Sequence, residues 1–288
     1  MDKLGLIIKS ISGEYVVEVD GAEYTCKPIG LFRYKKITPR VGDKCIIGYV
    51  DGAWVIKDIK KRKNELVRPV VANIDKVIIV TSLTEPDLNL NLLDRLICQV
   101  EYSDIPIVLV FSKADLVNLD DYKEVINYYK GLDYKVYLTP LEVNSLKEEF
   151  NDCICVLAGQ SGVGKSNLIN NLDLGINLKT GEISNALGRG KHTTRHTELY
   201  RIGSGYLADT PGFGALDLEM DEATLSQTFK EFFKLRCKYN PCYHLAEPGC
   251  KIKEEVDNGH ILKSRYDNYL LFLKEIKEAK QKNIYKKK

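Results

Sequence analysis

Residues 159–166 read GQSGVGKS, and this spacing of glycine, lysine and serine suits a loop that holds the phosphates of a nucleotide. Glycines at its ends allow backbone conformations that turn successive N–H groups toward phosphate oxygens at the start of a helix. Lys165 would reach the outer phosphates, and the Ser166 hydroxyl would bind Mg²⁺. We therefore expect a P-loop formed by Gly159, Gln160, Ser161, Gly162, Val163, Gly164, Lys165, Ser166 and Asn167.

A P-loop also needs a carboxylate near Mg²⁺, and the segment GYLADTPGFG (205–214) supplies one. Asp209 ends an apolar run, and the N–H of Gly212 could turn toward a γ-phosphate. Between the two motifs lies the polar loop GRGKHTTRH (188–196), in which a threonine hydroxyl could complete the Mg²⁺ shell. Thr193 and Thr194 fit this role equally well.

The residue that orients the attacking water is not in its usual place. Ras-type sites carry a glutamine soon after the D-x-x-G turn, whereas this chain has Phe213, whose ring cannot hydrogen-bond to water. His192 is the nearest alternative, because its imidazole can accept from or donate to water. We predict slow hydrolysis by the isolated protein and the following catalytic residues: Lys165, Ser166, His192, Thr193, Thr194 and Asp209.

The base of the nucleotide is predicted to be guanine, and the motif that reads it lies upstream of the P-loop. The run IPIVLVFSKAD ends with Ser112, Lys113, Ala114 and Asp115, close to the [NT]-K-x-D pattern whose aspartate accepts hydrogen bonds from guanine. Strand order along the chain and strand order in a sheet can differ. A GTPase cut after its switch motifs and rejoined at its old ends would place this strand first, so we expect a circularly permuted domain.

A separate cluster near the C-terminus has the spacing of a metal site. The segment CKYNPCYHLAEPGC reads C-x4-C-x-H-x5-C and contributes Cys237, Cys242, His244 and Cys250. Three thiolates and one imidazole suit tetrahedral Zn²⁺ and leave no open position for catalysis, so one structural zinc is expected. The other cysteines lie in apolar contexts and are predicted to be buried in the core: Cys26, Cys45, Cys98, Cys153 and Cys155.

Three patterns of secondary structure carry these motifs. Residues 1–66 alternate polar and apolar residues between Asp-Gly turns, which predicts about five short strands in an OB-like or SH3-like barrel. Residues 67–220 alternate apolar strands with helices, which predicts a parallel sheet covered on both faces. Residues 221–288 have helical spacing around the Cys/His cluster. We expect a multi-domain chain: barrel, α/β GTPase domain and zinc-binding helical domain.

The motif order S-K-A-D, G-Q-S-G-V-G-K-S, G-R-G-K-H-T-T and D-T-P-G-F resembles the RsgA (YjeQ/YloQ) family of circularly permuted GTPases. The resemblance covers the whole chain and implies an RNA-binding barrel and a GTPase that assists late maturation of the small ribosomal subunit. It also implies stimulation by that subunit and partners that include its rRNA, GTP and GDP. Two features depart from the family: Ser112 stands where asparagine is usual, and residues 138–144 read LTPLEVN instead of a typical guanine-contacting loop.

Composition is that of an ordinary globular protein, with 44% hydrophobic and 28% charged residues in 288. No apolar run approaches the ~18 residues of a membrane span, so we expect no signal peptide and no membrane partner. The clustered cysteines indicate a reducing cytoplasm, and we expect a monomer. Basic runs at 57–63 and 285–288 would suit RNA phosphates. Two alternatives stay open: an adenine-nucleotide P-loop enzyme, and a scaffold that binds nucleotide and RNA with negligible turnover.

Overall fold

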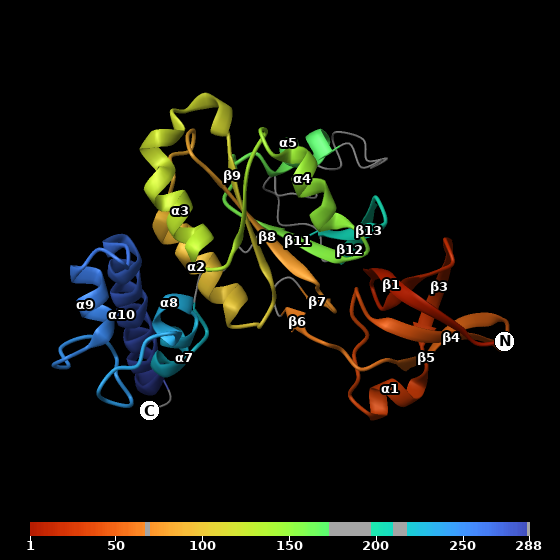
Figure 1. Cartoon of the computed structure of the whole chain (residues 1–288). Coiled ribbons are helices and arrows are strands. Elements are labelled where there is room, and N and C mark those ends of the chain that lie inside the picture. Colours follow the sequence, from red (N-terminus) through yellow and green to blue (C-terminus); the bar gives the residue numbers. More distant parts are fainter. Residues whose placement is uncertain (67–69, 173–196, 210–217, 287–288) are drawn as a thin grey trace. The chain divides into compact units, whose positions relative to one another are not determined.

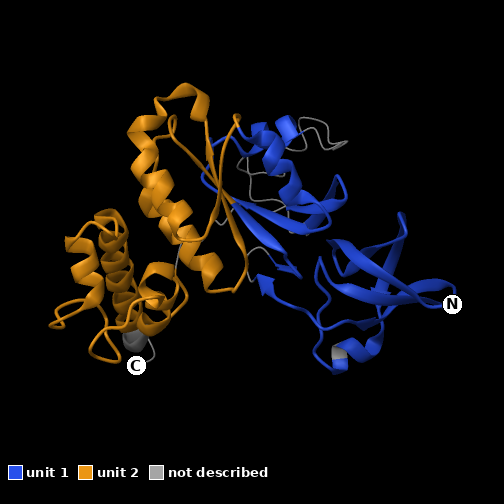
Figure 2. Cartoon of the chain, in the orientation of Figure 1, with its two compact units in different colours: residues 1–78, 142–214 blue, residues 79–141, 215–288 orange. Residues whose placement is uncertain are grey.

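The computed structural model describes residues 1–66, 70–172, 197–209 and 218–286. The chain forms two compact units, one of residues 1–78 and 142–214 and the other of residues 79–141 and 215–288 (Figure 2). Each unit therefore joins a part of the expected GTPase domain to one of the flanking domains. This division follows packing rather than sequence order, and the domain boundaries after residues 66 and 220 stay predictions.

The N-terminal part of the first unit is a closed five-stranded barrel (Figure 1). Its strands follow the order β1-β2-β3-β5-β4, and β1 also pairs with β4. Alternation explains the core, because in the segment EYVVEV the side chains of Tyr15, Val17 and Val19 are buried while their neighbours face outward. The predicted barrel is confirmed; its elements are β1 (Lys3–Ile11), β2 (Glu14–Val19), β3 (Ala22–Pro28), α1 (Gly30–Tyr34), β4 (Lys44–Val50) and β5 (Ala53–Ile59).

The rest of the first unit contains the P-loop and a β-hairpin. Strand β11 (Ile154–Ala158) is buried throughout and runs parallel to β13 (Gly205–Asp209). Strand β13 pairs with β12 (Thr197–Ile202), and β12 pairs with β1 of the barrel (Figure 1). The remaining elements of this unit are β6 (Glu65–Leu66), β7 (Val71–Ala72), α4 (Val143–Lys147), η3 (Glu148–Phe150) and α5 (Lys165–Leu172).

The second unit holds the strand that ends in the predicted base-reading motif, together with its neighbours. Strand β8 (Lys76–Ser82) begins in the first unit and ends in the second, where β9 (Ile107–Ser112) lies parallel to β10 (Lys135–Leu138). All six residues of β9 are buried, as expected for a strand covered on both faces. The helices of this part are α2 (Leu90–Glu101), η1 (Ala114–Leu116), η2 (Leu119–Tyr122) and α3 (Lys123–Gly131).

The C-terminal part of the second unit is helical, as predicted. An aromatic core made mainly by Phe229, Phe232, Tyr269 and Phe272 holds the helices together, and Cys98 of α2 belongs to the same cluster. The helices are α7 (Glu222–Gln227), α8 (Lys230–Phe233), α9 (Lys251–Asp257) and α10 (Lys263–Lys286). All five cysteines that the sequence assigned to the core are buried.

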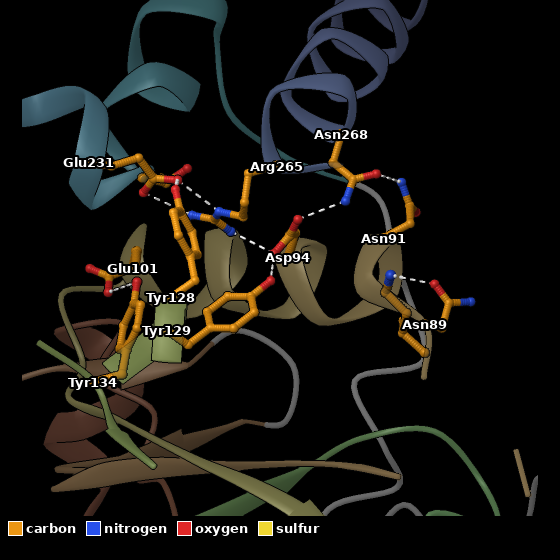
Figure 3. A network of polar contacts seen from close by, with 12 residues as sticks. Asn89, Asn91, Asp94, Glu101, Tyr128, Tyr129, Tyr134, Glu231, Arg265 and Asn268 are labelled. Carbon is orange, nitrogen blue, oxygen red and sulfur yellow. Dashed lines mark hydrogen bonds and ion pairs between the residues drawn. The ribbon is translucent and has the colours of Figure 1, made fainter. Parts of the chain in front are cut away.

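A buried ionic network links these C-terminal helices to α2 and α3 (Figure 3). The guanidinium of Arg265 is fully buried and donates to Asp94 Oδ1 at 2.6 Å and to Glu231 Oε1 at 2.8 Å. Tyr129 and Asn268 also donate to Asp94, and Tyr128 donates to Glu231. Burial alone would lower the pKa of Arg265, but the two carboxylates outweigh it and raise that pKa. The network therefore keeps a charged arginine in the core.

None of the helices described here is long and apolar enough to cross a lipid bilayer.

Candidate nucleotide and metal sites

The predicted P-loop has the strand–loop–helix geometry that phosphate binding needs. It connects the buried strand β11 to helix α5, which begins at Lys165. Gly159, Gly162 and Gly164 have φ angles of 142°, 85° and 93°, which residues with a Cβ rarely adopt. These three positions explain why the motif is glycine-rich, because they let the backbone N–H groups converge at the start of α5.

Lys165 points back over the loop that it ends. Its ammonium donates to the carbonyl oxygens of Gly159 and Gln160, each at 2.8 Å. The residue is only 8% exposed, and burial lowers the pKa of its ammonium. The two carbonyl oxygens are neutral acceptors and only partly compensate the charge of the ammonium. A negatively charged phosphate oxygen would compensate it better, so the site is suited to an anion.

The predicted Mg²⁺ carboxylate lies at the end of a strand next to the P-loop strand. Asp209 is the last residue of β13, and β13 is hydrogen-bonded to β11 in parallel. Parallel strands place their carboxyl ends at the same edge, so the backbone of Asp209 lies at the edge from which the P-loop leaves. His192, Thr193, Thr194, Gly212 and Phe213 lie outside the described residues.

The predicted base-reading motif in the second unit is held by the ends of its neighbouring strands. Ser112 ends β9 and its hydroxyl donates to the carbonyl of Thr81 at 3.3 Å. Lys113 has a left-handed backbone with a φ of 59° and donates through Nζ to the carbonyl of Glu85. Ala114 is buried, and Asp115 is exposed at the start of a 3-10 turn, where its carboxylate is accessible to a ligand.

Residues 138–140, where a guanine-contacting loop was expected, do lie beside this motif. The N–H of Ala114 donates to the carbonyl of Thr139 at 3.0 Å, and the N–H of Thr139 donates to Phe111 at 2.9 Å. The unusual sequence LTPLEVN at residues 138–144 therefore changes the side chains of this loop, but its backbone still lies next to Ala114. The sequence could not reveal this contact, because it depends on the parallel pairing of β9 with β10.

The four predicted zinc ligands gather into one cluster in which their ligand atoms lie within 4.8 Å of one another. Tetrahedral Zn²⁺, with bonds of about 2.3 Å to sulfur and about 2.0 Å to nitrogen, separates two sulfurs by ~3.8 Å and a sulfur from a nitrogen by ~3.5 Å. Cys237 and Cys250 have their sulfurs 3.8 Å apart, and each lies 3.6 Å or less from Nδ1 of His244. The cluster can thus hold a metal ion, and its dimensions fit zinc.

Helix α10 supports the cluster from the outside. The hydroxyl of Tyr266 donates to the carbonyl of His244 at 2.6 Å, and that of Tyr269 donates to Tyr243 at 3.0 Å. Burial lowers the pKa of His244, which favours the neutral imidazole that binds metals. The carbonyl contacts fix the loop on the aromatic core, so a bound metal and the packing of α10 would stabilise each other.

Most side chains of the basic run at 57–63 are paired with carboxylates in the structure. Four of its side chains form ion pairs with carboxylates: Lys57 with Asp2, Lys60 with Asp58, Arg62 with Asp43 and Glu65, and Lys63 with Asp75. Asp43 is fully buried, so Arg62 serves to neutralise it. The sequence alone could not show the pairs with Asp2, Asp43 and Asp75, which lie on other segments of the chain. RNA phosphates would have to compete with them.

Comparison with known proteins agrees with this geometry. Residues 59–219 match a family model described as RsgA GTPase, and residues 4–52 match one described as RsgA N-terminal domain. A relative from Oceanobacillus iheyensis, named small ribosomal subunit biogenesis GTPase RsgA 2, is 46% identical and is aligned over 96% of this chain and 98% of its own. A relative from Halalkalibacterium halodurans, named small ribosomal subunit biogenesis GTPase RsgA, is 43% identical over 95% and 97%.

Solved structures extend the likeness to the fold. The crystal structure of YjeQ from Thermotoga maritima superposes with a TM-score of 0.83 at 32% identity, covering 96% of this chain and 99% of that one. The crystal structure of YloQ, a circularly permuted GTPase, gives 0.81 at 34% identity and covers 97% and 96%. The resemblance inferred from the order of the motifs is confirmed, as is the permuted fold, and the chain belongs to the RsgA family of GTPases.

Proposed function

We propose that this protein hydrolyses GTP while docked on the immature small ribosomal subunit, and that the subunit stimulates hydrolysis, which leads to release. The observation that carries the proposal is the P-loop with Lys165 folded over it, in a chain whose relatives are named for small-subunit biogenesis. The protein would act as a cytoplasmic monomer. Binding to purified small subunits with a non-hydrolysable GTP analogue and with GDP tests docking, and equal affinity in both states would contradict a release step.

In this proposal the P-loop residues bind the phosphates and the Mg²⁺ that accompanies GTP. The backbone of residues 159–164 cradles the phosphates, Lys165 neutralises the outer ones, and Asn167 continues the helix start. Ser166 and Asp209 would hold Mg²⁺, which when bound neutralises charge that develops on the phosphates. Thr193 or Thr194 would complete its shell, and the N–H of Gly212 would contact the γ-phosphate.

Asp115 is proposed to read guanine, with Lys113 lying along the base and Ser112 and Ala114 shaping the strand end. Asp115→Asn should weaken GTP binding by ~10-fold or more and favour xanthosine triphosphate, because xanthine presents a carbonyl where guanine has an amine. The measurement is a titration of GTP, XTP and ATP against both proteins. Unchanged GTP affinity would exclude this assignment, and tighter binding of ATP than GTP by the wild type would favour an adenine-nucleotide enzyme.

His192 is proposed to orient the attacking water when the subunit is bound, since Phe213 replaces the usual glutamine. His192→Ala should lose most of the subunit-stimulated rate while keeping GTP affinity and subunit binding. A variant stimulated as strongly as the wild type would exclude His192 and point to another loop residue or to an rRNA group.

The Cys237, Cys242, His244 and Cys250 cluster is proposed to hold one structural Zn²⁺ per chain. Cys242→Ser should lose the metal and lower the stability of residues 221–288, because the aromatic core around α10 depends on the fixed loop. Elemental analysis of freshly purified protein measures the metal, and far-UV circular dichroism measures the helices. Cys26→Ser, at a buried cysteine outside the cluster, should retain the zinc. Protein without zinc would remove the assignment.

A further inference from the structure

Strand β1 of the barrel changes its pairing partner along its length. Residues 3–6 pair with β4 and close the barrel, whereas Lys9 and Ser10 pair with β12 of the hairpin. Between the two stretches, the register of β1 with β2 shifts at residues 7–9. Such a β-bulge bends a strand and increases its twist, so it can direct the second half of β1 from the barrel to the hairpin.

The second half of β1 leads directly to the strand end that carries Asp209. Lys9 lies opposite Glu198 on β12, and Glu198 lies opposite Asp209 on β13, so the three residues occupy one row across three strands. Neighbouring strands are ~4.8 Å apart, which places the backbone of Asp209 ~10 Å from the barrel strand. An ion pair of 2.9 Å between Lys9 and Glu198 reinforces this row.

A second contact joins the barrel to the other end of the hairpin. Glu18 of β2 accepts hydrogen bonds from Arg201 at 2.6 Å and from the hydroxyl of Tyr206 at 2.9 Å. The Glu18 side chain is only 14% exposed, although Arg201 is largely in solvent. Burial and the hydrogen bond to Glu18 raise the pKa of Tyr206 to about 12, which keeps its hydroxyl protonated as a donor.

The hairpin also packs against the segment that precedes the P-loop strand. A Cβ at Gly205 would lie 2.2 Å from the carbonyl oxygen of Phe150, so glycine is needed for this close approach. The N–H of Asp152 donates to Ser204 Oγ at 3.0 Å, and the N–H of Tyr206 donates to Cys153 at 2.8 Å. The hairpin is therefore held on one side by the barrel and on the other by the strand that leads to the phosphates.

We propose that Lys9 and Glu18 are positioning residues, which tie the barrel to the β12–β13 hairpin and so couple binding of a partner by the barrel to the nucleotide state at Asp209. The inference rests on the proposed function, since it takes the partner to be the small ribosomal subunit and Asp209 to be the Mg²⁺ carboxylate. The backbone pairing of β1 with β12 provides the connection, and the two side-chain contacts stiffen it. By linkage, the subunit and GTP must change each other's affinity by the same factor.

The test compares two double variants that make the same chemical changes. Lys9→Met with Glu18→Met removes both ties, while Lys27→Met with Glu14→Met removes an exposed ion pair of 3.2 Å inside the barrel. Both remove one positive and one negative charge, so their net charge and long-range attraction to RNA are matched. Thermal unfolding checks that both full-length proteins are folded. We expect both to fold, because losing partly exposed ion pairs costs little stability.

The quantity measured is the ratio of the affinities for small subunits with a non-hydrolysable GTP analogue and with GDP. We expect this ratio to fall by about fivefold or more toward unity in the Lys9 and Glu18 variant, and to stay at the wild-type value in the control. An unchanged ratio in both variants would overturn the proposed coupling while leaving the proposed function intact. A wild-type ratio of one would contradict the proposed release step, and the coupling with it.

Discussion

Replacing Lys165 with alanine is expected to lower the rate of GTP hydrolysis by roughly 100-fold or more, the effect typical of losing one preorganised electrostatic contact to a transition state. The lysine is held over the loop by two carbonyl oxygens and is almost completely buried, so water cannot replace its charge well. Phosphate release at saturating GTP measures the rate, and a binding titration separates lost affinity from lost turnover.

Lys130→Ala provides the control, because this lysine is exposed on α3 and should have no effect on hydrolysis. Ser166→Ala should behave like Lys165→Ala if the hydroxyl binds Mg²⁺, and added Mg²⁺ should restore part of its rate but none of the rate of the lysine variant. Undiminished phosphate release from Lys165→Ala would mean that hydrolysis takes place elsewhere or is due to a contaminant.

Replacing Arg265 with methionine is expected to destabilise the second unit by about 3–5 kcal/mol. Methionine fills much of the space, but it leaves the carboxylates of Asp94 and Glu231 buried without their cation. Burial raises the pKa of Glu231, but the charge and hydrogen bonds of Arg265 outweigh it and lower that pKa. The cost should appear as a lower midpoint of denaturant-induced unfolding followed by the circular dichroism of the helices.

A matched control lies on the same helix. Lys263→Met removes an exposed ion pair with Asp267 and should change stability by less than about 1 kcal/mol. Adding Asp94→Asn and Glu231→Gln to Arg265→Met should recover part of the loss, since no charge then stays buried. If Arg265→Met were as stable as Lys263→Met, the network would contribute little to holding the C-terminal helices on α2 and α3.

Motifs made of neighbouring residues could be predicted from the sequence. The P-loop and the Cys/His cluster each depend on spacings within 14 residues, and the structure brings both together as expected. The barrel could be predicted as well, because period-two alternation separates its core from its surface. Even the permuted order could be inferred, since a strand ending in Ser112-Lys113-Ala114-Asp115 needs no particular place in the chain.

Contacts between distant segments could not be predicted. Arg265 lies 171 residues from Asp94, and nothing in its helical context distinguishes it from an exposed arginine. Arg62 looked like part of an RNA-binding run, yet it neutralises the buried Asp43. The pairing of Lys9 with Glu198 joins residues 189 apart. In each case tertiary packing determines the partner, and the spacing of residue types along the sequence does not show it.

We propose that the small ribosomal subunit controls this GTPase, and phosphate release from GTP tests that control most directly. The rate should be low for the protein alone and should rise by at least about tenfold when purified small subunits are added in excess over the protein. Large subunits should leave it unchanged, and Lys165→Ala should remain inactive in every mixture. Equal rates with and without small subunits would contradict stimulation by the subunit, and rates that stay negligible in both mixtures would favour a scaffold that binds nucleotide and RNA with negligible turnover.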